Sequence, residues 1–405
     1  MSKPVVSLAA CKSYTPEELK TALIKLFADL GGMDKYVAKG AKVVLKPNLV
    51  MGKSPSACAT TNPEFIKQLA DILKEHGARL YIAESPGGPY TSARLNAVYN
   101  ACGITKIAAE TGIVLNYKTE VVKKENPNGK LLKMIELVKP LAEADFIINL
   151  PKPKSHGQMT YTGAVKNMFG AVAGVYKMDY HMRMSEYDNF ADAIIDIFLC
   201  VKPGLTIMDA VMGMDGNGPT NGKPKHIGLI CASEDAFALD LTMLDILGLD
   251  PRKAPVMKQG MLRNLCVNNI SEIEIKGDNP EKFFVDDFCF PSASSINHFH
   301  ANFLLKPFAR FFKPSPYFLH DRCVSCGDCA RLCPAEIIAM KEKKPYADLT
   351  KCLRCFCCQE LCPADAVEIK RSSLYKFFQA LYRAIMSLYK FAYETFKQRA
   401  PIERS

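Results

Sequence analysis

The chain lacks several features that would assign it to a familiar class of protein. Its 405 residues include no tryptophan and no stretch approaching the roughly 20 apolar residues that cross a bilayer. No N-terminal signal peptide is recognisable, so the sixteen cysteines favour free or metal-bound thiols in a reducing cytosol over a disulfide scaffold. We therefore expect a cytoplasmic protein that does not span a membrane.

Nucleotide-binding motifs are also missing. Gly213-x4-Gly218 is followed by Pro219-Thr220 and lacks the lysine of a Walker A loop. This run does not open a helix, as a dinucleotide fingerprint must. The net charge of +10 suggests nucleic acid, but the basic residues form no helix-turn-helix or single-strand platform. We expect no nucleoside triphosphatase, no NAD site and no nucleic-acid partner.

What the chain does have is one four-cysteine pattern, C-x2-C-x2-C-x3-C-P, present twice. In bacterial two-cluster ferredoxins, three closely spaced thiolates hold one cluster and the fourth cysteine ligates the other. The pattern therefore predicts two [4Fe-4S] clusters. We expect the first on Cys323, Cys326, Cys329 and Cys362, and the second on Cys352, Cys355, Cys358 and Cys333.

Zinc is the alternative metal for such cysteines, because paired C-x2-C motifs can bind it tetrahedrally. A third cysteine at the same gap and the C-x3-C-P ending are not features of zinc ribbons. Cys357 falls outside the register, and we interpret it as a buried thiol.

The first 280 residues read as strands alternating with helices, the pattern of an α/β domain with a mostly parallel sheet. Thr15 followed by Glu18 fits a capping box, and Asn62 before Pro63 is a second helix start. The expected strands are Val5–Ala10, Ala41–Lys46, Leu80–Glu84, Phe146–Leu150, Leu205–Asp209 and His226–Cys231. The expected helices are Thr15–Leu30, Pro63–His76, Asp188–Val201 and Ala236–Leu247.

Three further regions complete the predicted organisation. Residues 281–319 are rich in aromatic residues and proline and form a connector, and residues 320–370 form a small α+β ferredoxin-like dicluster domain. Residues 371–405 are basic, with leucines and tyrosines recurring every seven positions, and predict a C-terminal amphipathic helix. This helix could pack on protein or lie peripherally on a membrane surface.

Charged and polar side chains gather where the predicted strands end, which is where open α/β sheets bind ligands. We expect a clamp of lysines for a small anionic substrate, with Lys154, Lys166 and His156 handling protons. The carboxylates would pair with the lysines or hold a divalent cation. The candidate catalytic residues are His156, Lys154 and Lys166, and the candidate substrate-binding residues are Lys46, Asn48, Lys152, Asn167, Glu84, Asp209 and Asp215.

These segments, in this order, resemble the motifs of domain of unknown function family 362, which is often fused to a dicluster ferredoxin. The segments that carry the resemblance are Lys46-Pro47-Asn48, Glu84-Ser85-Pro86-Gly87, Pro151 to His156, Gly163 to Gly170 and Asp209 to Pro219, and the match covers about residues 40–245. The resemblance implies no activity, because none is assigned to the family.

Three functions remain open from the sequence. The first is a ferredoxin-coupled oxidoreductase in which the clusters deliver electrons to an anionic substrate in the N-terminal domain. The second is an electron relay without chemistry of its own, whose basic tail docks a redox partner protein or an anionic membrane. The third is a metal-dependent enzyme that performs no redox reaction and uses Glu84, Asp209 and Asp215.

Overall fold

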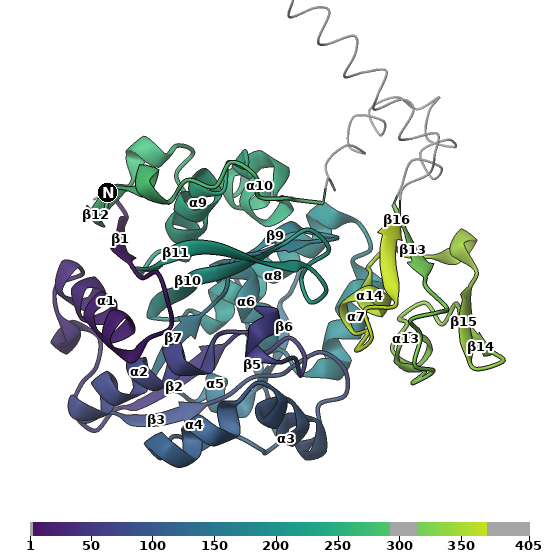
Figure 1. Cartoon of the computed structure of the whole chain (residues 1–405), viewed down its shortest axis with the longest axis horizontal. Helices are drawn as coiled ribbons and strands as arrows, with labels where there is room; N and C mark the ends of the chain where they lie inside the picture. The colour runs from purple at the N-terminus through teal and green to yellow at the C-terminus, as the bar shows by residue number, and fades with distance from the viewer. Residues whose placement is uncertain (1–2, 292–313, 371–405) are drawn as a thin grey trace, which may run out of the picture.

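The computed structural model describes residues 3–291 and 314–370 (Figure 1). Within residues 3–291 the strands form a ten-stranded sheet in the order β12-β1-β11-β10-β7-β2-β3-β4, with β8 and β9 attached through β10. These strands are β1 Val5–Ala10, β2 Lys42–Pro47, β3 Arg79–Ile82, β4 Val114–Leu115, β7 Phe146–Leu150, β8 Lys154–His156, β9 Thr160–Thr162, β10 Leu205–Asp215, β11 Lys223–Ser233 and β12 Glu274–Gly277.

Most neighbours in the sheet are parallel. The run from β10 through β7, β2 and β3 to β4 is parallel throughout, as is the β1–β12 pair. Only β11 among the strands of the main path runs antiparallel to both of its neighbours, β1 and β10. The centre of β2 is a continuous apolar run, Val43–Val44–Leu45, buried on both faces as parallel strands require. The predicted mostly parallel α/β fold is therefore confirmed.

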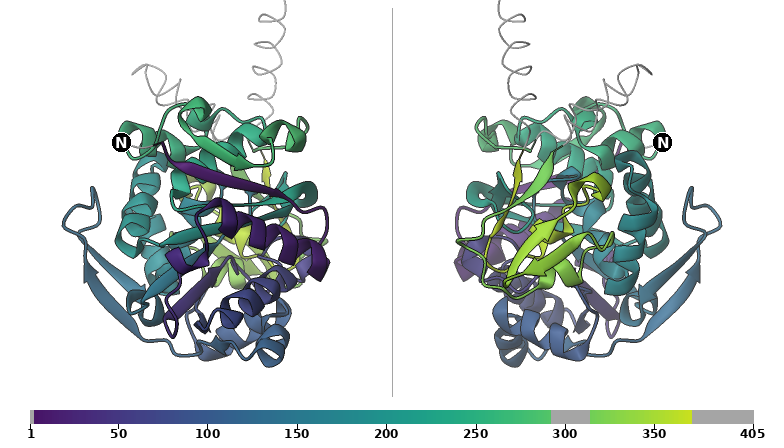
Figure 2. Two further views of the ribbon diagram at one scale, coloured as in Figure 1. Left: turned by 90° about the vertical axis from the view of Figure 1, so that its left-hand side faces the viewer. Right: turned by 90° about the vertical axis from the view of Figure 1, so that its right-hand side faces the viewer.

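Helices cover both faces of the sheet (Figure 2). Helices α1 to α4 pack their apolar side chains with Val43 and Leu45, whereas α6, α8, α9 and α10 pack on the face that Val44 occupies. The helices of this part of the chain are α1 Pro16–Asp29, α2 Pro63–Glu75, α3 Ser92–Ala101, α4 Ile104–Thr111, α5 Lys139–Ala142, α6 Ala164–Asn167, α7 Gly174–Arg183, α8 Tyr187–Val201, α9 Ala236–Ile246 and α10 Pro255–Leu262. The hairpin of β5 Val121–Glu125 and β6 Met134–Val138 forms a separate small sheet.

The two predicted helix starts differ in outcome. The Asn62 side chain accepts a hydrogen bond from the Glu64 backbone N–H and caps α2 as expected. The capping box at Thr15 is wrong, because the Thr15 side chain makes no capping hydrogen bond. The Glu18 carboxylate instead accepts from the backbone N–H groups of Lys12 and Ser13, 2.8 Å away in each case.

Strands β10 and β11 are longer than the sequence predicts. The apolar signal ends at Asp209, but pairing continues to Asp215 and resumes at Lys223 on the return strand. Residues 216–222 therefore form the tip of a long hairpin. This tip reaches the C-terminal module, which fixes how the two parts of the chain meet.

The module itself consists of two small hairpin-like sheets and two one-turn helices. These elements are β13 Ser315–Phe318 paired with β16 Val367–Lys370, β14 Ile338–Lys341 paired with β15 Lys344–Ala347, α13 Asp328–Arg331 and α14 Cys357–Glu360. Strand β13 lies within residues 281–319, which the sequence predicts as a connector. It pairs with β16, so it belongs to the module instead. Residues 292–313 of that connector and the predicted helical tail, residues 371–405, lie outside the described residues.

Candidate functional site

Two cavities of the C-terminal module are lined by cysteines. One is lined by Cys323, Cys326, Cys329 and Cys362. The other is lined by Cys333, Cys352, Cys355 and Cys358. The structure thus brings together the four thiols of each expected set, including the fourth cysteine from the opposite repeat.

The turns around these cavities repeat the same backbone geometry. Ser325 and Arg354, each two residues after the first cysteine of its repeat, adopt left-handed conformations with φ of 63° and 61°. Their backbone N–H groups each donate to that cysteine's Sγ at 3.4 Å. Gly327 and Phe356 are also left-handed at equivalent positions. The N–H groups turn toward sulfur, as a loop that solvates a metal–thiolate cluster requires.

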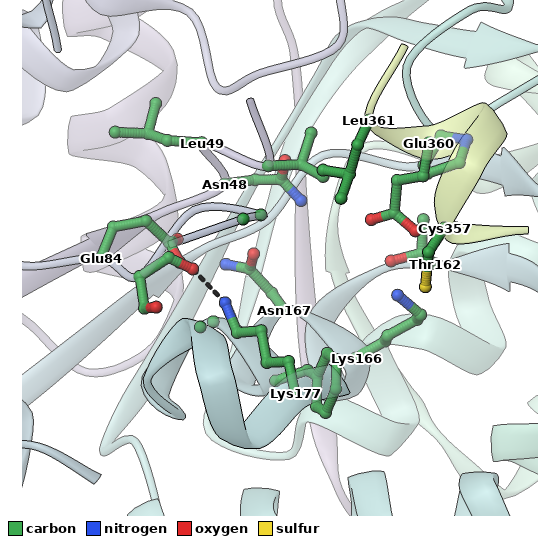
Figure 3. Close-up of a pocket in the computed structure, with 18 of the residues that line it drawn as sticks. Asn48, Leu49, Glu84, Thr162, Lys166, Asn167, Lys177, Cys357, Glu360 and Leu361 are labelled. Atoms are coloured by element: carbon green, nitrogen blue, oxygen red, sulfur yellow. Dashed lines mark hydrogen bonds between the residues drawn. The ribbon is translucent and has the colours of Figure 1, made fainter. Parts of the chain in front are cut away.

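A third cavity, of about 90 Å³, lies between the module and the N-terminal domain (Figure 3). The N-terminal domain contributes lysines from four separate segments, and α14 together with Leu361 forms the opposite wall. The polar lining residues are Lys46, Asn48, Glu84, Ser85, Thr162, Lys154, Lys166, Asn167, Lys177, His181, Cys357 and Glu360.

The hairpin tip between β10 and β11 holds α14 in place. Thr220 Oγ1 donates to the Glu360 carbonyl at 2.8 Å, and Asn221 Nδ2 donates to the Gln359 carbonyl at 3.0 Å. In return Gln359 Nε2 donates to the Asn217 carbonyl at 2.8 Å. Three hydrogen bonds therefore hold a helix that contains Cys358 and ends two residues before Cys362.

Lys46 and Glu84 form a buried pair at the inner end of the cavity. Lys46 Nζ lies 2.5 Å from Glu84 Oε2 and also donates to Asn167 Oδ1 at 3.1 Å. Burial lowers the pKa of Lys46 and raises the pKa of Glu84, each partly opposed by the partner's charge. A methyl group on Gly170 would collide with both charged groups, so this position needs glycine.

The other cavity lysines differ in how they are partnered. Lys154 Nζ donates to Asn48 Oδ1 at 3.0 Å and to the Ala59 carbonyl at 2.7 Å, and burial lowers the pKa of Lys154 to about 7. Lys177 donates to the Ser85 carbonyl, and burial lowers its pKa to about 8.

Lys166 is different. Among the described residues it has no hydrogen-bond or ion-pair partner, and its ammonium lies 5.8 Å from the centre of the Phe169 ring. Burial lowers the pKa of Lys166, and the negative charge of Glu360 opposes that shift. In Figure 3, Lys166 points toward Cys357 and Glu360, and Lys177 points toward Glu84.

His156 is buried beside this cavity but is not among the residues that line it. Its Nδ1 accepts hydrogen bonds from the backbone N–H groups of Gln158 and Met159, at 3.1 and 3.2 Å. The proton of the neutral ring must therefore be on Nε2, which lies 3.9 Å from Glu360 Oε2. Burial and the nearby charge of Lys166 hold the pKa of His156 well below its ordinary value.

Three expected site residues lie elsewhere. Lys152 Nζ donates to Asp209 Oδ2 at 2.8 Å and to Tyr14 at 2.9 Å, and neither Lys152 nor Asp209 lines the cavity. Asp215 lies at the end of β10, where its carboxylate accepts from the Cys289 N–H. The carboxylates expected to share a divalent cation thus have separate partners: Glu84 pairs with Lys46, Asp209 with Lys152, and Asp215 accepts from the Cys289 N–H.

Sequence reasoning missed Lys177, His181 and Glu360. Lys177 and His181 are four residues apart on α7, a spacing that places two side chains on one helix face and could have signalled the site. His181 stacks on Phe190 at 4.3 Å between ring centres, and burial lowers its pKa to about 3. Glu360 had no such signal, because only the docking of α14 brings it to the lysines.

No helix within residues 3–291 and 314–370 is long and apolar enough to cross a membrane. Comparison with known proteins gives two family matches. Residues 43–245 match the model described as domain of unknown function (DUF362), and residues 315–363 match a 4Fe-4S dicluster domain. The second match identifies the module as one that binds iron–sulfur clusters for electron transfer.

One curated relative is a thylakoid-associated protein of Synechocystis, 33% identical over 321 residues that cover 75% of this chain and 96% of the relative. Two solved structures align with TM-scores below 0.5. The lactate racemase apoprotein of Thermoanaerobacterium thermosaccharolyticum is 14% identical, with a TM-score of 0.35 over 56% of this chain and 54% of that one. A Thermotoga maritima protein is 16% identical, with a TM-score of 0.36 over 65% and 61%. The chain thus spans less than two thirds of each of these structures.

On the family match and the curated relative, the chain belongs to the DUF362 family and carries a C-terminal 4Fe-4S dicluster domain.

Proposed function

We propose that this protein transfers electrons from its iron–sulfur module to a small anionic substrate in the cavity between the two parts of the chain. One observation carries the proposal. Helix α14 forms a wall of that cavity through Cys357 and Glu360. It contains Cys358 and ends two residues before Cys362, and these two cysteines belong to different thiol sets. The cavity and both thiol sets therefore share one short segment.

The residues present fit two [4Fe-4S] clusters. Eight thiols line two cavities in sets of four, and backbone N–H groups point at the sulfur atoms of Cys323, Cys352 and Cys362. When bound, such clusters supply one-electron transfer at potentials set partly by these hydrogen bonds.

The cavity favours an anion of modest size. Four lysines line it against two glutamates, and one lysine, Lys166, has no partner among the described residues. A volume of about 90 Å³ is below the 150 Å³ of an engineered cavity that holds benzene, so the ligand has only a few non-hydrogen atoms.

Protons for a reduction are available at neutral pH. Burial lowers the pKa of Lys154 to about 7 and the pKa of Lys177 to about 8, so both ammonium groups can give up a proton near the working pH. Both line the cavity. We assign them as proton donors, while His156 faces Glu360 instead.

The test is reoxidation of the reduced protein. Anaerobic holoprotein reduced with dithionite and freed of excess reductant is mixed with a panel of small carboxylates and oxyanions, and the visible absorbance of the clusters is followed. We expect at least one anion to speed reoxidation, and Lys166→Met to abolish the effect. Lys123→Met, on the exposed hairpin β5–β6, is the matched control and should behave as wild type. A panel in which no anion speeds reoxidation would contradict the proposal.

A redox partner protein must supply the electrons. The first cysteine repeat supports docking of such a partner, because Val324 beside its first cysteine is 64% exposed and Cys326 is exposed as well. This surface also supports the alternative of an electron relay that performs no reaction of its own. The thylakoid association of the curated relative supports a peripheral membrane location, in which the basic tail would contact anionic lipid.

A further inference from the structure

The two cysteine repeats allow a position-by-position comparison within one chain. Both place leucine just before the fourth cysteine, and both place the preceding residues on a one-turn helix. In the first repeat Asp328 and Arg331 pair with each other, and the Arg331 side chain is 65% exposed. In the second repeat these positions are Cys357 and Glu360, and both line the cavity. The second helix therefore differs from the first where it faces the ligand space.

The backbone of Glu360 is held by the hairpin tip, but its carboxylate accepts no hydrogen bond from the described residues. The backbone carbonyl of Glu360 accepts from Thr220 Oγ1 at 2.8 Å. No hydrogen bond from residues 3–291 and 314–370 reaches the carboxylate: His156 Nε2 lies 3.9 Å from Glu360 Oε2, which is beyond hydrogen-bond distance. The Glu360 side chain is 17% exposed and lines the cavity, so its carboxylate is available to accept a hydrogen bond from a ligand there.

His156 can act on Glu360 in only one way. Two backbone N–H groups occupy Nδ1, so Nε2 carries the proton of the neutral ring. That N–H is buried and has no hydrogen-bond acceptor among the described residues. Glu360 Oε2 lies 3.9 Å from that nitrogen, and His156 does not line the cavity. We therefore infer that His156 positions Glu360 and does not contact the ligand.

The opposite charge lies at the same end of the cavity. Lys166 points toward Cys357 and Glu360 in Figure 3, yet no ion pair joins Lys166 to Glu360. Lys46, Lys154 and Lys177 already have oxygen partners. The described residues therefore leave one cation and one carboxylate available for a ligand placed between them.

We propose that the cavity binds a small carboxylate that carries a hydroxyl or amino group, with Lys166 binding the acid and Glu360, oriented by His156, accepting from the donor. This inference rests on the proposed function for its choice of cavity. It adds that the iron–sulfur module supplies a ligand-binding side chain, and that the arginine of the first repeat has no such role.

Equilibrium binding to the oxidised holoprotein tests this without any turnover. Acetate, glycolate and glycine are titrated by calorimetry under anaerobic conditions. Because a hydrogen bond to a charged group is at stake, glycolate or glycine should bind at least about tenfold more tightly than acetate. Equal affinity of all three, or no binding of any, would overturn the inference. The reoxidation experiment would still decide the proposed function, because it uses a wider panel and a kinetic signal.

Variants test which side chains cause the preference for glycolate or glycine over acetate. Glu360→Ala should reduce the ratio of affinities to about one, while Arg331→Ala at the equivalent position of the first repeat should leave it at the wild-type value. His156→Leu should lower the ratio severalfold, and His156→Gln, which keeps an N–H donor, should restore part of it. Iron and sulfide content checks that each variant keeps its clusters. If a variant loses them, the wild-type ratio alone decides. A ratio that persists in cluster-replete Glu360→Ala would overturn the assignment.

Discussion

The two cysteine repeats share their ligand spacing and turn geometry but differ in the side chains between the ligands. Where the first repeat has Gly327, Ala330 and Arg331, the second has Phe356, Gln359 and Glu360. In the first repeat, the Arg331 side chain of α13 is 65% exposed to solvent. In the second repeat, Gln359 and Glu360 bond to the hairpin tip, and Glu360 also lines the cavity. Ligand spacing is therefore set by the metal site, and the residues between ligands are set by what the repeat faces.

Phe356 shows what this specialisation costs. It takes a left-handed conformation, φ 60°, at the position where the first repeat uses glycine. That conformation is unfavourable by roughly 1–2 kcal/mol for a residue with a Cβ. Phe356 is only 3% exposed, and its ring lies against Gly157 of the β8–β9 turn. Burial of the ring offsets the backbone strain.

The largest effect should come from breaking the ligand sets. We expect Cys362→Ala to lose the cluster of the first repeat and to retain about four iron and four sulfide atoms instead of about eight. Cys357→Ser, five residues earlier, should retain about eight, because Cys357 lines the interdomain cavity and neither thiol set. Iron and acid-labile sulfide assays on anaerobically purified protein measure this. Loss of a cluster in Cys357→Ser would show that the register is misassigned.

The second effect is on the pH dependence of stability. Unfolded Lys154 keeps its proton up to about pH 10.4, whereas burial lowers the folded pKa to about 7. Between these values the unfolded state binds more protons, so this lysine makes the free energy of unfolding rise with pH, by at most about 1.4 kcal/mol per pH unit. Thermal unfolding of the holoprotein from pH 7 to 9.5 should show this slope, and Lys154→Met should reduce it.

Substitutions at equivalent positions of the two repeats test which residue sets this pH dependence. The charge of Glu360 raises the pKa of Lys154, so Glu360→Ala should move the onset of the slope to lower pH. Arg331→Ala should leave it unchanged, because its side chain is mostly exposed and pairs with Asp328. A Lys154→Met protein with the wild-type slope would mean that Lys154 stays charged in the folded state.

The smallest effect concerns docking of the module. Gln359→Ala gives the second repeat the residue that the first already has as Ala330, so the turn itself tolerates it. The loss is the hydrogen bond from Gln359 Nε2 to the Asn217 carbonyl, expected to cost about 0.5–1.5 kcal/mol. Denaturant unfolding of the variant, with Arg331→Ala as control, measures it. Equal stability of both variants would argue that the hairpin tip does not hold α14.

The sequence predicted those features that short spacing encodes. The thiol sets follow from gaps of two and three residues, and the strands from apolar runs such as Val43–Leu45. Lys46 and Lys154 were identified because they lie at or just after the ends of predicted strands, and Lys166 and Asn167 because they lie on the helical segment that follows. All four line the cavity. Nothing in the sequence separated Lys152 from Lys154, two residues away. In the structure the Lys152 ammonium donates instead to Tyr14 and Asp209, which come from distant segments.

Long-range packing accounts for what the sequence did not predict. Glu360 reaches the lysines only because residues 216–222 form the tip of a long hairpin that extends to α14. His156 looked like a proton donor to substrate, but two backbone N–H groups of its own turn fix its tautomer and aim it at Glu360. Such roles depend on which distant residue completes a contact, and no local pattern records that.

The placement of α14 has a thermodynamic consequence. Glu360 is two residues from Cys358 and two from Cys362 in the sequence. The charge of a ligand that contacts Glu360 in the cavity should therefore act on the clusters that these thiols would hold. Occupancy and oxidation state are then linked equilibria, and the coupling free energy is the same in both directions. If a ligand binds the oxidised form tenfold more tightly than the one-electron-reduced form, it lowers the midpoint potential by about 59 mV. The protein would then adjust its driving force each time the cavity fills or empties.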